Sequence, residues 1–429
     1  RVASGSVAVT FVAGSNGGTP ITDYDLEYST TPGFAAGTGT LYANGTSTAL
    51  TQSVTGLTDG TAYYFHVRAA NIAGNSQWSA TFGPVTPYDT PAAPIVVSAT
   101  RSGSGAVDVV FSAPSDGGSP IVDFDFEYSL TQGFAPGSGT FFEHGTSTAL
   151  SQTVSGLTNG VTYYFQVRAS NIAGDSPWSP TSSGATPFDV PQAPASLSAS
   201  RTGSGAIDVT FTSPVSDGGD PVSDFDIEYS TNPTFAAGSG TLVTNGTSIA
   251  LVQPVTGLTN GVAYYFRVRA SNSAGAGAWS VVSNSATPYT TPGAPTAVVS
   301  STGSSQATVT WSAPVSNGGA TVSDYRVTVY NATGGTPTGV SGATSRVVGS
   351  ATASFVFSGL TALTTYSFKV EAYNLAGWGT QSLLSTTVVP YTTPSAPTAL
   401  SASRIATQSV RVTFSPSSGM GAAVSDYDL

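Results

Sequence analysis

Cysteine is absent from the sequence, so no disulfide can brace its domains. Charged residues are scarce, at 8% of the chain against about 25% in ordinary globular proteins. The 12 basic residues include a single lysine, Lys369, and the net charge is −11. A chain this acidic, without a basic cluster, is not expected to bind nucleic acid or an anionic membrane. No run approaches the roughly 18 apolar residues of a membrane helix, so the sequence predicts no membrane span.

Histidine is nearly absent as well: only His66 and His144 occur. Nucleophilic catalysis needs a base beside the nucleophile, and neither histidine belongs to a motif that supplies one. The acids between Asp23 and Glu27 alternate, which places them on an open strand face rather than in the cleft of a glycosidase. We therefore expect no enzymatic activity, no catalytic residue and no cofactor.

What the sequence does contain is a long repeat. The stretch from Gly56 to Trp78 reads GLTDGTAYYFHVRAANIAGNSQW, and it recurs from Gly156, from Gly257 and, more loosely, from Gly359. The copies are about 100 residues apart. A period of this size is that of a whole β-sandwich and is too long for a solenoid unit.

Within the repeat, apolar and polar residues alternate from Tyr63 onward, as on a strand with one buried face. Leu57 precedes Tyr63 by six residues, which is the spacing of a tyrosine corner, where the Tyr hydroxyl returns to upstream backbone. The corner tyrosines of the four copies are Tyr63, Tyr163, Tyr264 and Tyr366.

This corner, followed by the pattern RAxNxAG, resembles strands E to F and the F–G loop of fibronectin type III domains. The resemblance covers nearly the whole chain, and it implies an all-β fold, a tandem array of immunoglobulin-like sandwiches of the bacterial surface or secreted type. The fold carries many unrelated functions. The integrin-binding tripeptide RGD of some animal members occurs nowhere in the sequence, so that activity is not implied.

Proline-rich joints separate the repeats, because proline stiffens a linker and cannot donate to a strand ladder. The joints predict five units. They are 1–88, a domain lacking its first strand; 92–188 and 192–289, two complete domains; 293–391, a divergent domain; and 395–429, a partial domain with its first three strands. Because both ends cut through a unit, we expect an excerpt of a longer repeat array rather than strand exchange between chains.

Charges on the outer face predict how two neighbouring strands pair. Each of the first three units has a glutamate on one strand and an arginine on the next, whereas the fourth has the opposite signs. Cross-strand ion pairs explain a joint reversal. The predicted pairs are Glu27–Arg68, Glu127–Arg168, Glu228–Arg269 and Arg326–Glu371.

Three other groups of residues could form binding or modification sites, but each also has a purely structural explanation. The tryptophans at the end of each repeat could stack on sugars, but packing explains them better; they are Trp78, Trp178, Trp279 and Trp378. Calcium could bind to Asp217, Asp220 and Asp224, although glycine turns already explain that loop. The sequons at Asn44, Asn245 and Asn331 could carry glycans, although hairpin turns account for the first two.

We interpret the chain as a non-catalytic extracellular structural protein, a stalk, filament or adhesin segment. Low surface charge would permit self-association into a filament or a surface layer. The alternatives are a spacer array of a secreted polysaccharide-degrading enzyme, or a phage or virion fibre whose loops bind a glycan or protein ligand.

Overall fold

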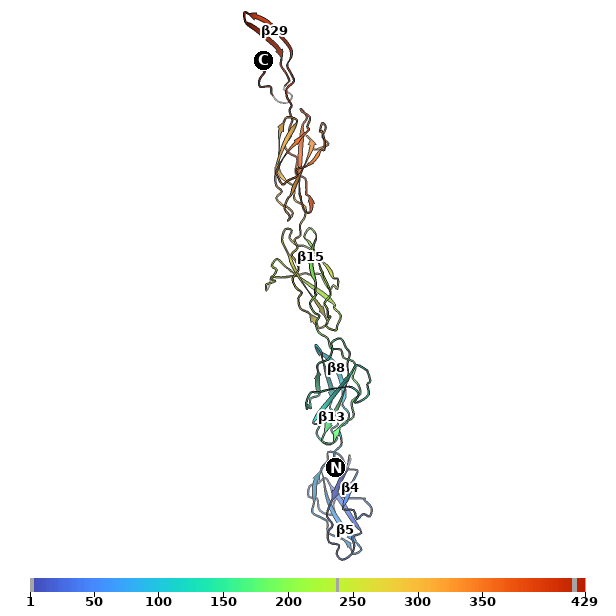
Figure 1. Cartoon of the computed structure of the whole chain (residues 1–429). Coiled ribbons are helices and arrows are strands. Elements are labelled where there is room, and N and C mark those ends of the chain that lie inside the picture. Colours follow the sequence, from blue (N-terminus) through green and yellow to red (C-terminus); the bar gives the residue numbers. More distant parts are fainter. Residues whose placement is uncertain (1–3, 237–238, 419–422, 429) are drawn as a thin grey trace. The chain divides into compact units, whose positions relative to one another are not determined.

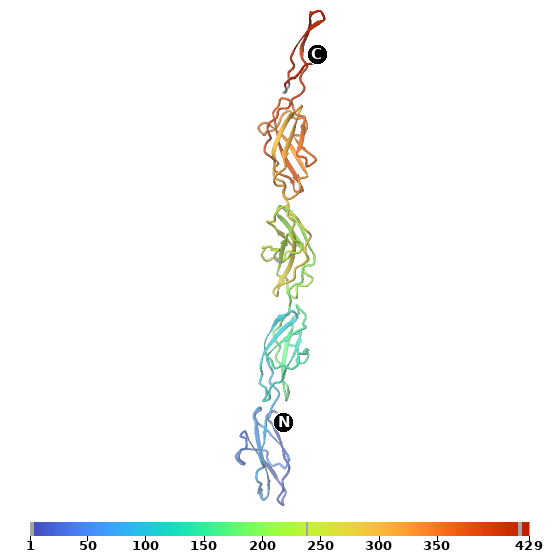
Figure 2. The ribbon, with the colours of Figure 1, turned by 90° about the vertical axis from the view of Figure 1, so that its left-hand side faces the viewer.

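The computed structural model describes residues 4–236, 239–418 and 423–428. Every regular element in these ranges is a β-strand, so the predicted all-β class is confirmed. Four sandwiches follow one another along the chain, as the colours in Figures 1 and 2 show. Each sandwich has a hydrophobic core of its own. A hairpin of β29 (Thr398–Ala406) and β30 (Ser409–Ser415) comes after the fourth.

The second sandwich has two antiparallel sheets that face each other. One sheet has the order β12 (Ser151–Val154), β9 (Ala106–Ser112) and β8 (Ile95–Gly103). The other has the order β11 (Thr140–Phe142), β10 (Asp123–Ser129), β13 (Tyr164–Asn171) and β14 (Gly174–Asp175).

The third and fourth sandwiches repeat this topology. In the third the sheets are β15 (Leu197–Gly203), β16 (Ala206–Phe211) and β19 (Val252–Val255), and then β18 (Thr241–Leu242), β17 (Asp224–Ser230), β20 (Tyr265–Asn272) and β21 (Gly275–Ala276). In the fourth they are β22 (Thr296–Gly303), β23 (Gln306–Ser312) and β26 (Ser354–Ser358), and then β25 (Ser345–Val347), β24 (Asp324–Asn331), β27 (Tyr366–Asn374) and β28 (Gly377–Trp378).

In the first sandwich, β1 (Val7–Thr10) pairs with β4 (Thr51–Val54) and with no other strand of the described residues. The larger sheet contains β3 (Thr40–Tyr42), β2 (Asp23–Ser29), β5 (Tyr63–Asn71) and β6 (Gly74–Asn75), with β7 (Phe82–Val85) also on β5. The predicted alternation places Leu26 and Phe65 in the core, 0% and 1% exposed.

The corner tyrosines join this core to the turn before their own strand. The hydroxyl oxygen of Tyr63 accepts the N–H of Thr58 at 3.0 Å. Tyr163, Tyr264 and Tyr366 accept equivalent N–H groups at 3.0, 3.1 and 3.2 Å. The bond holds the turn against the sheet and satisfies a partly buried amide.

In the second sandwich the segment around Trp178 is held by serines rather than by a regular ladder. In the second sandwich the N–H groups of Ser176, Ser179 and Ser182 donate to carbonyls of β13 at 2.8–2.9 Å. Their hydroxyl oxygens accept the N–H groups of the same strand residues at 2.9–3.0 Å. Each serine therefore makes both bonds of a strand residue, which allows proline to occupy the positions between them.

Candidate functional site

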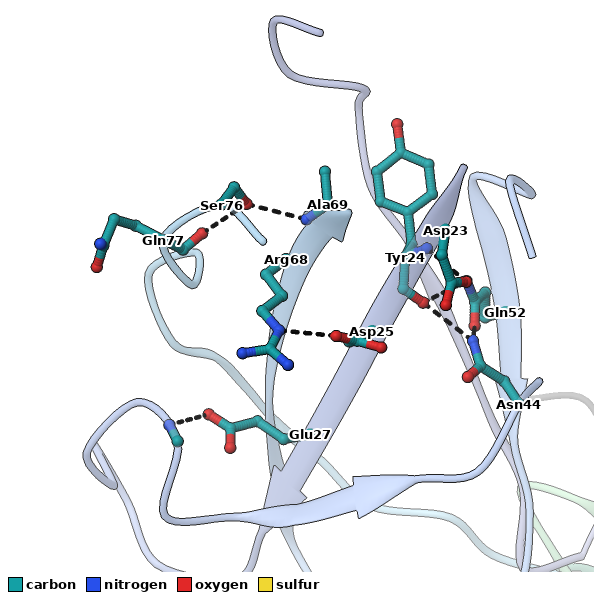
Figure 3. Close-up of polar contacts among 11 residues, drawn as sticks. Asp23, Tyr24, Asp25, Glu27, Asn44, Gln52, Arg68, Ala69, Ser76 and Gln77 are labelled. Carbon is teal, nitrogen blue, oxygen red and sulfur yellow. Dashed lines mark hydrogen bonds and ion pairs between the residues drawn. The ribbon is translucent and has the colours of Figure 1, made fainter. Parts of the chain in front are cut away.

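The outer face of the larger sheet carries most of the charged side chains singled out by the sequence. In the first sandwich the register of β2 and β5 places Asp25 opposite Arg68. The Arg68 Nε atom lies 2.7 Å from Asp25 Oδ2, as Figure 3 shows. The predicted pair Glu27–Arg68 is therefore wrong by two residues along β2, because Glu27 lies opposite His66.

The same correction applies to the next two sandwiches. Arg168 and Arg269 bind Asp125 and Asp226, each at 2.9 Å, and not Glu127 and Glu228 as predicted. The reason is geometric: residues two apart share a face of a strand, so a face alone does not specify the register. In the fourth sandwich Arg326 does face Glu371, with Nη2 and Oε2 2.6 Å apart.

The glutamates assigned to the pairs have another position, beneath the loop that follows their strand. Glu27 is 2% exposed, and its two carboxylate oxygens accept the N–H groups of Gly37 and Gly39 at 2.7 and 3.2 Å. Glu127 is equally buried and accepts equivalent bonds at 2.8 and 3.0 Å. We expected these glutamates to be exposed on the outer face, which was wrong because the loop after their strand covers that face. The buried carboxylate is a loop anchor, stabilised by charge-assisted hydrogen bonds.

The fourth sandwich, which lacks both the glutamate and the loop, supports the role of the glutamate as a loop anchor. Thr328 occupies the position of Glu27 in the strand, and the loop sequence GFAxGxGT is missing there. The glutamate and the loop that it holds are therefore lost together. In the third sandwich the equivalent Glu228 binds the guanidinium of Arg267.

The recurring tryptophans pack across this face, each beneath a guanidinium group. The Arg68 guanidinium carbon lies 4.5 Å from the centre of the Trp78 ring. The other stacks are Arg168 on Trp178 at 4.9 Å, Arg269 on Trp279 at 4.6 Å and Arg326 on Trp378 at 4.5 Å. The tryptophans are half-buried, so cation–π packing uses one ring face.

The histidines lie in separate structural positions. His66 is 4% exposed, its Nε2 is 2.8 Å from Thr81 Oγ1, and its ring packs on Phe34. His144 packs on the rings of Phe126 and Phe142. His66 Nδ1 lies 3.6 Å from Glu27 Oε1, within ion-pair distance of that buried carboxylate. In the second sandwich Gln166 occupies the position of His66 and donates to Thr181 Oγ1 at 2.9 Å, so the repeat uses this position for a structural contact that does not require histidine.

The candidate calcium ligands are used by their own loops. Asp217 accepts the N–H of Gly219, and Asp224 accepts the N–H of Ser248. Asp220 accepts the N–H and the hydroxyl of Ser273 at 3.0 and 2.7 Å, and these bonds, the backbone one first, lower the pKa of the Asp220 carboxyl. Among the described residues, no three acidic or histidine side chains are placed to hold a metal ion.

Two of the sequon asparagines use the amide nitrogen to which a glycan would be attached. Asn44 donates to the carbonyl of Tyr24 at 3.0 Å and to Gln52. Asn245 donates to Gln253. Asn331 caps the turn that follows it, accepting the N–H of Thr333 at 3.0 Å. Attachment of a glycan leaves one N–H on Nδ2, so at Asn44 it would break one of the two bonds of that nitrogen.

Sequence reasoning missed two groups of structural residues, the serines that hold the last segment of a sandwich and an asparagine at the end of each β5-type strand. The asparagine recurs in every repeat, and so does one serine position, which is Ser79, Ser179, Ser280 and Ser382. Their period was therefore the available signal. Within the described residues, no helix has the length and apolarity needed to cross a membrane.

Comparison with known proteins agrees with this architecture. The family model described as "Fibronectin type III domain" matches residues 1–83, 92–185, 192–286 and 292–388. Exoglucanase B of Cellulomonas fimi is 31% identical over 245 residues, which are 54% of this chain and 20% of that protein. Endoglucanase B of the same organism is 30% identical over 297 residues, 65% of this chain and 26% of that protein.

Animal proteins are similar too. Myomesin-2 of Homo sapiens is 27% identical over 239 residues, 52% of this chain and 15% of that protein. The solved structure of chicken CNTN1 FN1-FN3 domains is 19% identical, covers 71% of this chain and 99% of that chain, and has a TM-score of 0.27. The chain spans about a quarter or less of the length of these three named relatives.

Proposed function

Because the chain belongs to the fibronectin type III family, we propose that it is a non-catalytic structural array of an extracellular protein. Its sandwiches would act as spacers between other parts of that protein. The scarcity of lysine and the polar, weakly charged surface favour export.

The observation that supports this proposal is that the strand acids and the histidines considered for catalysis make structural contacts. The Glu27 carboxylate holds a loop through two backbone N–H groups, and Asp25 holds Arg68. The rings of His66 and His144 are packed among aromatic side chains. Among the described residues these groups leave no pair of carboxylates flanking a cleft, which glycoside hydrolysis requires.

The similarity to two glucanases favours the spacer role over other structural roles. Their names denote enzymes that act on glucans, and each is similar to this chain over a minor part of its own length. Sandwiches without catalytic groups, placed within such an enzyme, would separate its other domains. We therefore infer that this array belongs to a secreted protein that acts on, or attaches to, a polysaccharide.

A stalk, filament or adhesin segment is the second candidate, and the low charge supports it. With 8% charged residues, repulsion between like chains is weak, which would permit lateral self-association. In this reading a glycan or a protein would be the ligand of the loops.

Two measurements test the proposal. A panel of glycoside, peptide and ester substrates should show no turnover by the 429-residue chain; turnover that is lost in His66→Gln or His144→Gln would overturn it. Peptide mapping of the native full-length protein separates the two candidates. A catalytic module in the same polypeptide supports the spacer, whereas further sandwiches alone support the stalk or filament.

A further inference from the structure

The first linker, residues 86–94, is bound by the sandwich that follows it. Asn171, at the end of β13, donates through Nδ2 to the carbonyl of Asp89 at 2.8 Å and to that of Asp116 at 2.7 Å. The N–H of Asp89 donates to the carbonyl of Gly117 at 2.7 Å. We call this arrangement, made by the asparagine and the glycine of the facing loop, the linker socket.

The next two linkers occupy equivalent sockets. Asn272 donates to the carbonyl of Asp189 at 2.7 Å, and Asn374 donates to the carbonyl of Thr290 at 2.8 Å. In return the Asp189 and Thr290 N–H groups donate to glycine carbonyls, those of Gly218 and Gly318, each at 2.8 Å. These socket bonds use only the backbone of the linker residue, so either Asp or Thr can occur there.

The socket glycines are required because the linker carbonyl passes directly over them. A Cβ atom on Gly117 would lie 2.3 Å from the carbonyl oxygen of Asp89. On Gly218 and Gly318 it would lie 2.1 Å from the carbonyl oxygens of Asp189 and Thr290. A filled socket therefore has no room for any side chain at this glycine.

The first sandwich has the same socket residues, Asn71 and Gly17, around a cavity of about 270 Å³ that is also lined by Asn16, Ile21 and Gly74. Asn71 Nδ2 donates to the carbonyl of Asn16 at 2.9 Å, and no second acceptor for it lies among the described residues. A Cβ atom on Gly17 would meet nothing closer than Asn71 Nδ2, at 3.9 Å. Asn71 is only half-buried, whereas Asn171, Asn272 and Asn374 are 7%, 6% and 0% exposed.

We propose that this socket is a binding site for a proline-rich peptide of the linker type, Thr-Pro-aromatic-(Asp or Thr)-x-Pro. The peptide carbonyl accepts the second N–H of Asn71, and its N–H donates to the Gly17 carbonyl, as in the three filled sockets. Prolines on both sides hold such a peptide extended before it binds, so little conformational entropy is lost. The inference concerns binding alone and stands apart from the proposed spacer function.

The test uses a fluorescent peptide with the sequence of residues 86–94, TPYDTPAAP, titrated against the 429-residue chain by fluorescence anisotropy. We expect saturable binding. Gly17→Asn should weaken it by about tenfold or more, because the new side chain enters the space of the peptide carbonyl. Asn tolerates positive φ, and Gly33→Asn is the matched control, since the two glycines have φ of 61° and 62° and open surroundings.

A second peptide tests the geometry of recognition. Methylation of the Asp amide nitrogen removes the N–H that donates to the glycine carbonyl, and it should weaken binding to the same extent as Gly17→Asn. Absence of saturable binding at millimolar peptide, or equal affinity in Gly17→Asn and Gly33→Asn, would overturn the proposal. A concentration-dependent dimer that Gly17→Asn abolishes would also overturn it, because the occupant would then be an intact second chain.

Discussion

Arg326 on β24 and Glu371 on β27 face each other with their charges exchanged relative to Asp25 and Arg68 of the first sandwich. The guanidinium group changes strand, but it still stacks on the tryptophan, Arg326 on Trp378 and Arg68 on Trp78. The outer face of each sandwich therefore carries the same three groups, which are an acid, an arginine and a tryptophan ring. Either of the two strands can supply the arginine.

This relationship predicts the outcome of a charge-swap cycle. Glu371→Arg alone should lower the free energy of unfolding of the fourth sandwich by about 0.5–1 kcal/mol, since it places two cations opposite each other on a partly exposed face. Adding Arg326→Glu should restore it, because the new arginine can take over the stack on Trp378. Denaturant melts of the four proteins give the coupling free energy. Additive effects would contradict the pairing, and high salt should reduce the coupling.

The loop anchor predicts a larger effect from a buried site. Glu127→Gln should destabilise the second sandwich by about 1–3 kcal/mol, because one of the two loop N–H groups loses a charged acceptor. Limited proteolysis should then cleave within residues 133–139 first. Glu143→Gln removes the same charge from an exposed position of that sandwich and is the control. Equal behaviour of the two variants would refute the anchoring role of Glu127.

The tyrosine corner predicts a local loss of stability. Tyr264→Phe removes the acceptor of the Thr259 N–H, and we expect a cost of about 1–2 kcal/mol confined to the third sandwich. Hydrogen exchange followed by mass spectrometry resolves the sandwiches separately. Tyr265→Phe is the matched control, since the Tyr265 hydroxyl accepts no such bond from the described residues. Faster exchange in all four sandwiches of Tyr264→Phe would show that they do not unfold independently.

The lowered pKa of Asp220 predicts a pH dependence of the loop that it caps. The hydrogen bonds from the Ser273 N–H and hydroxyl favour the ionised carboxylate, so the folded pKa lies below the unfolded one. The stabilisation is therefore complete above about pH 4 and is lost as the pH falls through the lower, folded pKa. The protection factor of the Ser273 amide, its exchange rate compared with that of an unstructured peptide at the same pH, should fall in that acidic range. Asp220→Asn should remove this pH dependence; an unchanged profile would contradict the assignment.

Much of the fold could be predicted from the sequence because it depends on short-range patterns. A period of about 100 residues, strict alternation after Tyr63 and the spacing from Leu57 to Tyr63 indicate a sandwich with a tyrosine corner. The resemblance of these patterns to fibronectin type III domains implied a tandem array of that family, and the family match confirms it. Proline-rich joints marked the linkers for a similarly local reason, since proline cannot donate to a strand ladder.

Only the tertiary structure decided which residues meet across strands and loops. Asp25 and Glu27 lie on one strand face and looked equivalent, but the register gives Arg68 to Asp25, and a covering loop buries Glu27. Likewise, glycine in the loop between Asp217 and Asp220 indicated a turn, whereas the folded chain shows that the linker carbonyl of Asp189 passes over Gly218. Alternation and period are properties of neighbouring residues, and the sequence alone determines them. Register and close approach depend on how distant segments pack, so they exist only once the sandwich has formed.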